Sequence, residues 1–276
     1  MLITVDDLTE AMLSDNPPVI LDVRWQLGDD RGHDHYREGH VPGAVFVDLD
    51  RELAAAPSPQ RGRHPLPDIA DLQAAARRWG IDDRSPVVAY DAIGNLASAR
   101  AWWLLRWGGH SDVRLLDGGL GAWRDAGLRL SSGDTTPRTG SVTLTPGHLP
   151  VAEIDEVAAT SARVVDARAA ERYRGEVEPV DPRAGHIPGA ISVPTAGNIG
   201  ADGRFLPADD IRKRFADNGI GDSDEVIAYC GSGINAAHEI AALEIAGIRA
   251  TLFPGSWSQW SSDPDRPAAT GSESAG

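Results

Sequence analysis

The sequence predicts an α/β protein made of two tandem copies of one domain, each a mostly parallel sheet flanked by helices on both faces. Two observations lead to this fold class. Short apolar runs alternate with helical stretches through each half of the chain, and such alternation is typical of parallel sheets covered by helices. The second half of the 276-residue chain also repeats motifs of the first half, which indicates a duplicated domain.

Four short motifs recur in the same order in both halves. The clearest is Gly-His-[Val/Ile]-Pro-Gly-Ala, and two others are apolar runs that end in Asp-x-Arg or in Tyr followed by Asp or Cys. The four pairs occupy 19–24 and 163–168, 39–44 and 185–190, 87–91 and 226–230, and 118–123 and 255–260. Their spacing drifts by a few residues, as expected for a whole repeated domain with loop insertions rather than a short solenoid unit.

The elements of each copy follow from these motifs in order. The apolar runs that end in Asp-x-Arg, and the Val-[Val/Ile]-Ala-Tyr runs, are short and continuous, as buried strands are. Helices are expected at 69–79, 97–107, 211–218 and 236–246. We expect an N-terminal domain at 1–128, a linker rich in turn formers at 129–147, a C-terminal domain at 148–262 and a loose polar tail at 263–276.

Composition limits the function classes. Lysine and arginine number 26 against 41 aspartates and glutamates, a net charge of −15, which argues against a nucleic-acid partner. Binding a small anion would therefore need a local cluster of arginines. No apolar run is long enough for a membrane helix, and the N-terminus lacks the basic segment of a signal peptide. The single cysteine excludes an internal disulfide and a Cys-x-x-Cys redox pair, and predicts a reducing, cytoplasmic setting.

That cysteine, Cys230, follows the expected strand at 226–229 and precedes an expected helix. Gly231 and Gly233 permit a tight loop at this junction. A sulfur placed here faces the N–H groups of the loop and the positive end of the helix dipole. Both favour the thiolate, which is the nucleophilic form. We therefore expect a reactive nucleophile rather than a small buried apolar side chain.

Asp91 occupies the position of Cys230 in the first copy. A carboxylate cannot take up sulfur as a thiolate does. Only the C-terminal copy is therefore expected to be catalytic, and the N-terminal copy is expected to be a structural and substrate-shaping partner.

These residues resemble the two-domain rhodanese-like sulfurtransferases, which include thiosulfate and 3-mercaptopyruvate sulfurtransferases. The resemblance covers residues 3–262 and includes the loop Cys-Gly-Ser-Gly-Ile-Asn at 230–235. It implies two rhodanese-like domains and a transfer in which Cys230 becomes a persulfide and passes the sulfur to a thiol or cyanide. No metal or organic cofactor is implied. Thioredoxin and glutathione are among the acceptors that stay open.

The side chains of the cysteine loop bear on the donor. In thiosulfate-type members this loop carries cationic residues, whereas Gly231, Ser232 and Gly233 carry none. The loop therefore resembles the 3-mercaptopyruvate type, and we favour that donor, with thiosulfate:cyanide transfer as the alternative. The backbone N–H groups expected to hold the persulfide belong to Gly231, Gly233, Ile234 and Asn235.

In the 3-mercaptopyruvate type, the loop serine is thought to join a histidine and an aspartate of the other domain in a relay. Ser232 and His40 occupy matching positions in this sequence. The alternative for His40 is that it only stabilises its Val-Pro-Gly turn. Three aspartates upstream of His40 are candidates for the third member, and their spacing does not choose between them: Asp29, Asp30 and Asp34.

Two arginines are expected to bind the anionic donor. Arg172 matches the substrate-binding arginine of the family's Gly-Arg-[Phe/Tyr] segment, although Glu171 replaces the glycine. Arg183 approximates a second carboxylate-binding arginine, and arginine suits bidentate recognition of carboxylates. Arg24 and Arg168 recur in both halves and are expected to be structural.

Two other function classes share features with this sequence. A phosphatase of the Cys-x5-Arg kind would need arginine at position 236, where the sequence has Ala236. A non-catalytic sulfur carrier or interaction module fits a duplicated domain, but such modules usually lose the cysteine. The intact glycine loop around Cys230 favours an enzyme.

Overall fold

The computed structural model describes residues 1–272, which fall into two compact units. Each unit includes a short segment from the half of the sequence that makes up the other unit. Unit 1 comprises Met1–Ala55, Pro67–Leu149 and Gly200–Phe205, and unit 2 comprises Ala56–Leu66, Pro150–Ile199 and the chain from Leu206 onward.

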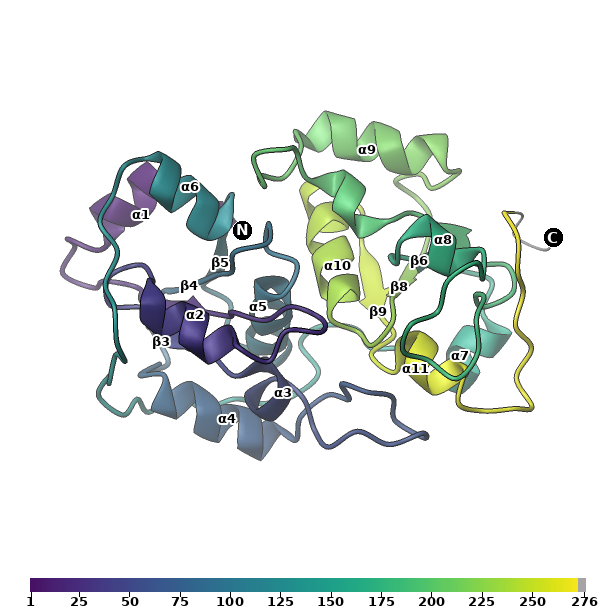
Figure 1. The fold of residues 1–276 in the computed structure, drawn as a ribbon, viewed down its shortest axis with the longest axis horizontal. Helices are drawn as coiled ribbons and strands as arrows, with labels where there is room; N and C mark the ends of the chain where they lie inside the picture. The colour runs from purple at the N-terminus through teal and green to yellow at the C-terminus, as the bar shows by residue number, and fades with distance from the viewer. Residues whose placement is uncertain (273–276) are drawn as a thin grey trace. The chain divides into compact units, whose positions relative to one another are not determined.

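Unit 1 is built on a five-stranded sheet in the order β1-β5-β4-β2-β3, in which every neighbouring pair is parallel (Figure 1). Its strands are β1 (Leu2–Ile3), β2 (Val19–Asp22), β3 (Val45–Phe46), β4 (Val87–Tyr90) and β5 (Val113–Leu116). Its helices are α1 (Val5–Ala11), α2 (Gly32–Glu38), α3 (Leu49–Glu52), α4 (Ile69–Arg78), α5 (Ser98–Trp107) and α6 (Gly119–Asp125). All four residues of β4 are buried, as expected for a central parallel strand covered on both faces.

The core of unit 1 lies on both sides of this sheet. Leu8 of α1 and Leu120 and Trp123 of α6 belong to one buried cluster with Ile20 and Val88 of the strands. Successive strand residues face opposite sides, and α5 contacts β4 and β5 from the other side. The predicted helices on both faces are therefore present (Figure 1).

Unit 2 repeats this topology. Its sheet has the order β7-β6-β8-β9, again with parallel neighbours, which matches β3-β2-β4-β5 of unit 1. The strands are β6 (Arg163–Asp166), β7 (Ile191–Ser192), β8 (Val226–Tyr229) and β9 (Ala250–Leu252). The helices are α7 (Ile154–Ala159), α8 (Ala170–Tyr173), the 3₁₀ helix η1 (Thr195–Asn198), α9 (Ala208–Asp217), α10 (Asn235–Ile245) and α11 (Ser256–Trp260). The predicted fold class and the duplication are confirmed.

The stretch predicted as a linker, 129–147, belongs to unit 1. Ser131 exchanges two backbone hydrogen bonds with His40, and Gly140 donates its N–H to the Arg77 carbonyl. Val142 and Leu144 are buried. This stretch has no helix or strand, but it is fixed by backbone hydrogen bonds and apolar contacts.

The stretch predicted as a loose tail is tied to unit 2 as far as residue 271. Ala269 exchanges two backbone hydrogen bonds with His186, and Gly271 donates its N–H to the Arg174 carbonyl. The indole of Trp260 donates to the Pro267 carbonyl at 2.8 Å. The part of the predicted tail up to residue 271 thus has backbone hydrogen-bond partners in unit 2. Residues 273–276 lie outside the described residues.

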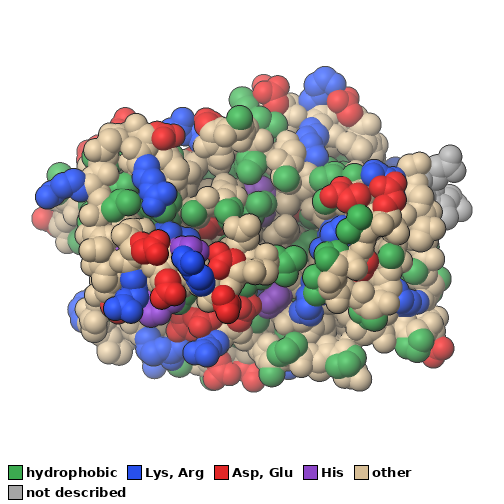
Figure 2. Space-filling model, viewed as in Figure 1, with side chains coloured by type: hydrophobic (Ala, Val, Ile, Leu, Met, Phe, Trp, Pro, Cys, Tyr) green, Lys and Arg blue, Asp and Glu red, His purple; other side chains and the backbone are tan. Residues whose placement is uncertain are grey.

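Charged groups of both signs are interspersed on the face shown in Figure 2, and the mixture is densest over α2. No helix in residues 1–272 is both long enough and apolar enough to cross a membrane.

Candidate active site

Cys230 comes directly after β8, and its loop leads into α10. The residue is buried, with 3% of its surface exposed. Gly233 adopts φ +81°, and a Cβ there would lie 2.5 Å from the Pro254 carbonyl oxygen, so the turn requires glycine. This turn brings the Gly233 N–H to the sulfur, to which it donates at 3.1 Å. The predicted strand–loop–helix setting is thus present.

The segment 255–260, which is the second copy of the fourth repeated motif, packs behind this loop. The Ser256 hydroxyl accepts from the Cys230 N–H at 3.1 Å and donates to the Phe253 carbonyl at 2.9 Å. The N–H groups of Trp257 and Ser258 donate to the carbonyls of Cys230 and Gly231, each at 2.9 Å. Four hydrogen bonds therefore fix the backbone around the sulfur without using the sulfur itself.

Two arginines face the loop at Gly231. A Cβ built on this glycine would lie 3.0 Å from Nη2 of Arg63 and 3.3 Å from Nη1 of Arg172. The loop side chains are neutral, as the sequence shows, but positive charge reaches the loop from outside it. Arg172 was predicted for the site, and Arg63 was not.

Ser232 is hydrogen bonded to His64. The distance between the Ser232 Oγ and the His64 Nδ1 is 2.8 Å, and Ser232 is buried. The tautomer of the imidazole decides which of the two atoms donates.

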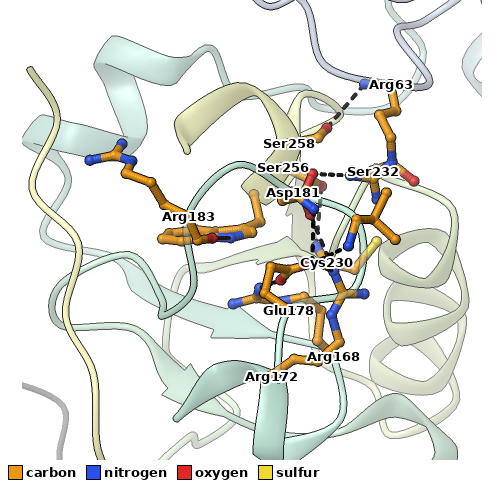
Figure 3. A network of polar contacts seen from close by, with 12 residues as sticks. Arg63, Arg168, Arg172, Glu178, Asp181, Arg183, Cys230, Ser232, Ser256 and Ser258 are labelled. Carbon is orange, nitrogen blue, oxygen red and sulfur yellow. Dashed lines mark hydrogen bonds and ion pairs between the residues drawn. The ribbon is translucent and has the colours of Figure 1, made fainter. Parts of the chain in front are cut away.

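Arg63 and His64 reach the cysteine loop because residues 56–66 belong to unit 2. The Arg63 N–H donates to the Ser258 hydroxyl at 3.0 Å (Figure 3), and the Gln259 amide donates to the Gln60 carbonyl. Gly62, at φ +86°, passes so close to the Gly255 carbonyl that a Cβ would lie 2.6 Å from it. The segment is therefore held against the motif that supports Cys230.

Sequence reasoning missed both residues, although one signal was available. The dipeptide Gly62-Arg63 recurs as Gly203-Arg204 ahead of a Leu-Pro pair in each copy. The second of these segments, Gly200–Phe205, belongs to unit 1. The exchange is reciprocal, and Phe205 stands where the first copy has His64.

His40 has a different setting from the one predicted. Its Nδ1 donates to the Tyr36 carbonyl at 3.0 Å, its ring stacks on Tyr36, and its Nε2 lies 3.4 Å from the Thr135 hydroxyl. His186 makes the equivalent bond and stack with Tyr173. Both histidines fasten the turn of the repeated motif. The histidine hydrogen bonded to Ser232 is His64, whereas the relay role was predicted for His40.

The three aspartates considered for the relay lie in unit 1. Asp29 accepts from the Arg31 N–H and pairs with the His35 imidazole at 3.0 Å, and the Arg31 hydrogen bond is the main cause that lowers the pKa of Asp29. Asp30 and Asp34 are exposed.

Arg183 lies apart from the cysteine loop. Its guanidinium donates to four backbone carbonyls, and Figure 3 shows it directed away from Cys230. The carbonyls belong to Trp260, Ser261, Asp263 and Arg266. Arg183 was predicted to bind substrate, and in this structure its side chain anchors the end of α11 and the segment after it.

Arg172 lies in a network of charged groups. It pairs with Glu178 at 2.7 Å and with Asp181 at 3.2 Å, and Arg63 pairs with Asp181 (Figure 3). Arg168 pairs with Asp166 at 2.6 Å, and Arg24 repeats this pair with Asp22 in unit 1. The recurring Asp-x-Arg arginines are thus structural.

The two carboxylates on Arg172 differ in ionisation. Burial disfavours the charge on Glu178, but hydrogen bonds from the Asp181 N–H and from Arg172 more than offset it, so its pKa lies below the usual range. Burial raises the pKa of Asp181, against the effect of Arg63 and with the help of Glu178. Within residues 1–272, no cluster of three or more His, Cys, Asp or Glu residues could hold a metal ion.

A buried cysteine after a parallel strand, backed by a fixed loop and faced by arginines, defines a cysteine-dependent enzyme on a duplicated α/β fold. The rhodanese-like domain family matches residues 4–126 and again 152–263. The chain belongs to this family and is a sulfurtransferase, as its relatives are.

Two relatives match over nearly their whole length. SseB of Mycobacterium tuberculosis, provisionally named a thiosulfate sulfurtransferase, is 48% identical over 98% of this chain and 97% of its own. A Pseudomonas aeruginosa protein, provisionally named a 3-mercaptopyruvate sulfurtransferase, is 45% identical over 98% of each chain. Among solved structures, SseA of Escherichia coli, a 3-mercaptopyruvate enzyme, matches with a TM-score of 0.83 at 30% identity, over 93% of this chain and 98% of its own.

Proposed function

We propose that this enzyme moves sulfane sulfur from 3-mercaptopyruvate to a thiol or cyanide through a persulfide on Cys230. The observation that carries the proposal is the Ser232–His64 hydrogen bond beside the cysteine loop. A hydroxyl–imidazole pair suits a carbonyl that gains negative charge, and a guanidinium suits a carboxylate. 3-Mercaptopyruvate carries both groups, and Arg172 lies next to the same loop.

In the first half-reaction, the Cys230 thiolate attacks the donor sulfur and an S–S bond forms. The C–S bond of the donor breaks, and its electron pair passes to carbon as the enolate of pyruvate, which then takes up a proton. Ser232, hydrogen bonded to His64, stabilises the oxygen of that enolate. The products are a persulfide anion on Cys230 and pyruvate.

In the second half-reaction, cyanide or a thiolate attacks the terminal sulfur, and the S–S electron pair returns to Cys230. Cyanide leaves as thiocyanate, and a thiolate leaves as a persulfide. This is a double displacement with one covalent intermediate. The acceptor in the cell is a low-molecular-weight thiol or a protein thiol such as that of thioredoxin, in the reducing cytoplasm expected for a chain with one cysteine.

The loop N–H groups stabilise the persulfide. Gly233 already donates to the sulfur, and the N–H groups of Gly231, Ile234 and Asn235 line the same turn. The matching loop of unit 1 supports this role, because its Asp91 carboxylate accepts four backbone N–H groups. The position after the central strand therefore suits an anion in both copies.

A second donor is favoured by one observation. The Arg63 guanidinium lies beside Gly231 and supplies the cation that the loop side chains lack, which suits the sulfonate end of thiosulfate. In that case the Cys230 thiolate takes the outer sulfur and sulfite leaves with the electron pair of the S–S bond. The persulfide is the same for both donors.

Steady-state kinetics with both donors tests the choice. We expect a higher kcat/KM for 3-mercaptopyruvate than for thiosulfate. Arg172→Ala should lower kcat/KM for 3-mercaptopyruvate by about one to two orders of magnitude, because a charge-assisted contact is lost. Arg174→Ala, which removes a partly exposed arginine paired with Glu176, is the matched control and should change little. A wild-type preference for thiosulfate would contradict the choice of donor and leave sulfur transfer intact.

A further inference from the structure

Asp181 forms ion pairs with Arg63 and Arg172, the two arginines that face the cysteine loop at Gly231. Its carboxylate pairs with Arg63 through one oxygen and with Arg172, at 3.2 Å, through the other. Its side chain is only 3% exposed, and both partners lie at Gly231. A carboxylate of the protein thus sits where the arginines would grip the anionic group of a donor.

The neighbouring acid, Glu178, is held in a different way. Its carboxylate accepts from the backbone N–H groups of Val180 and Asp181 as well as from Arg172 and Arg168. The oxygen that accepts from Arg172 also accepts from these two N–H groups, so moving the carboxylate away from Arg172 would break hydrogen bonds within the loop. The Asp181 carboxylate, by contrast, accepts hydrogen bonds from the side chains of Arg63 and Arg172.

The charges of the network cancel. It holds three arginines and three carboxylates, with the pairs linked through shared partners: Arg63, Arg168 and Arg172, and Asp166, Glu178 and Asp181. An arriving donor anion would add a negative charge to a balanced and largely buried group, which is unfavourable. The arginine Nε atoms of Arg63 and Arg172 are also buried without a hydrogen-bond partner in the described part of the protein. Once the Asp181 carboxylate moves away, both guanidiniums therefore have N–H groups available to bind an anion.

We propose that Asp181 is an internal competitor for the donor. It holds Arg63 and Arg172 in the free enzyme and gives them up when the anionic group of a donor binds. A carboxylate or sulfonate offers each guanidinium an oxygen in the matching geometry and so competes with Asp181 better than a single chloride ion does. Asp181 thereby restricts the site to donors with several acceptor oxygens. This inference rests on the proposed function only in taking the donor to be an anion bound by these arginines.

Equilibrium binding tests this without turnover. In a Cys230→Ser background, calorimetric titration with thiosulfate and with pyruvate reports anion affinity apart from sulfur chemistry. Asp181→Asn keeps the shape of the side chain and removes its charge. We expect it to lower the dissociation constant of both anions by about threefold to tenfold, since a competing ion pair is removed. Chloride should inhibit turnover of Asp181→Asn at concentrations that leave the wild type unaffected.

Glu176→Gln is the matched control, because Glu176 is an acid on the same loop, pairs with Arg174 and is exposed. It should leave both dissociation constants within about twofold of the parent, since removing an exposed pair changes little. If Asp181 only orients the arginines, Asp181→Asn will instead weaken binding of both anions, and that result, or no change, would overturn the proposal. Asp181→Ser serves as a second variant if melting shows that the amide variant does not fold.

The pH dependence gives a second readout. Asp181 faces Arg63, Arg172 and Arg168 and the carboxylate of Glu178. Protonation of Asp181 weakens its hold on the arginines, so wild-type affinity for thiosulfate should rise as the pH falls through its pKa. Asp181→Asn should lose this rise. Retention of the full rise in the variant would assign it to another group. If the enzyme proves not to prefer 3-mercaptopyruvate, the binding experiments with thiosulfate still test the role of Asp181.

Discussion

At the scale of single residues, the hydrogen bond between Ser232 and His64 is expected to determine which sulfur donor the enzyme prefers. Thiosulfate has no carbonyl, so it has no use for a group that stabilises an enolate oxygen. Ser232→Ala should therefore lower kcat/KM for 3-mercaptopyruvate by about 10²-fold, a usual effect of losing such a group, and affect thiosulfate much less. Steady-state kinetics of the variant with both donors provides the measurement.

His64→Gln is expected to act through the same hydrogen bond. The double variant should then cost little more than the larger single change, because two residues that act as a unit are not additive. Fully additive losses, or equal losses with both donors, would show that Ser232 and His64 do not work together on the carbonyl.

At the scale of elements, the loops after β4 and β8 occupy matching positions and differ in their anion. Asp91 is fully buried, and its carboxylate accepts the N–H groups of Ile93, Asn95, Ala97 and Ser98 at 2.8–2.9 Å. In the other loop, Cys230 has this position. One copy thus carries a permanent carboxylate at this position. The other carries the Cys230 sulfur, which takes up a second sulfur atom and passes it on during the proposed reaction.

Asp91→Ala should cost stability rather than activity. It leaves three buried N–H groups and one partly buried N–H group without their acceptor, so we expect the free energy of unfolding to fall by about 3 kcal/mol. At a temperature where the variant is folded, kcat/KM should stay near the wild-type value. Denaturation and kinetics on the same preparation check both parts. Loss of activity with unchanged melting would mean that the loop takes part in the chemistry.

The parts of the site that lie on regular elements could be predicted from the sequence, and the parts brought from elsewhere could not. An apolar run followed by Cys-Gly-x-Gly predicts the strand, the loop and the helix that position Cys230. Arg63 and His64 lie in an irregular segment whose place is set by contacts with Ser258 and Gly255. The contacts of Arg183 could not be predicted, because its partners are backbone carbonyls, which no side-chain pattern reveals.

At the scale of the whole molecule, duplication supplied two copies of one sheet and only one nucleophile. The topology of the two sheets agrees strand for strand from β2 to β5 and from β6 to β9. Each copy also gives a Gly-Arg segment to the compact unit of the other. For the catalytic copy, that segment brings Arg63 and His64. A chain cut between the halves would therefore separate Arg63 and His64 from the unit that contains Cys230.

The stability of the folded molecule should depend on a buried acid behind the cysteine loop. Glu239 on α10 is completely buried, and burial raises its pKa to about 7, against the effect of hydrogen bonds from Thr195 and Asn198. The folded state then holds this proton more tightly than the unfolded chain. Its contribution to stability is full below pH 4.5 and is lost as the pH rises through about 7.

Glu239→Gln removes this titration and keeps a group that can accept from Asn198. The variant should be more stable than wild type at pH 8, by up to about 3 kcal/mol, and the difference should shrink toward pH 5. Chemical denaturation of both proteins across this range provides the comparison. Parallel pH profiles for the two proteins would show that Glu239 does not titrate in this window.

The persulfide on Cys230 is the centre of the account, and intact-mass spectrometry tests it most directly. After treatment with 3-mercaptopyruvate or thiosulfate and removal of the donor, the wild type should gain one sulfur, about 32 Da. Cyanide should remove that mass and release thiocyanate. Cys230→Ser, with the same fold by melting, should gain nothing and show no turnover. Sulfur uptake by the serine variant, or turnover without a persulfide in the wild type, would contradict the account.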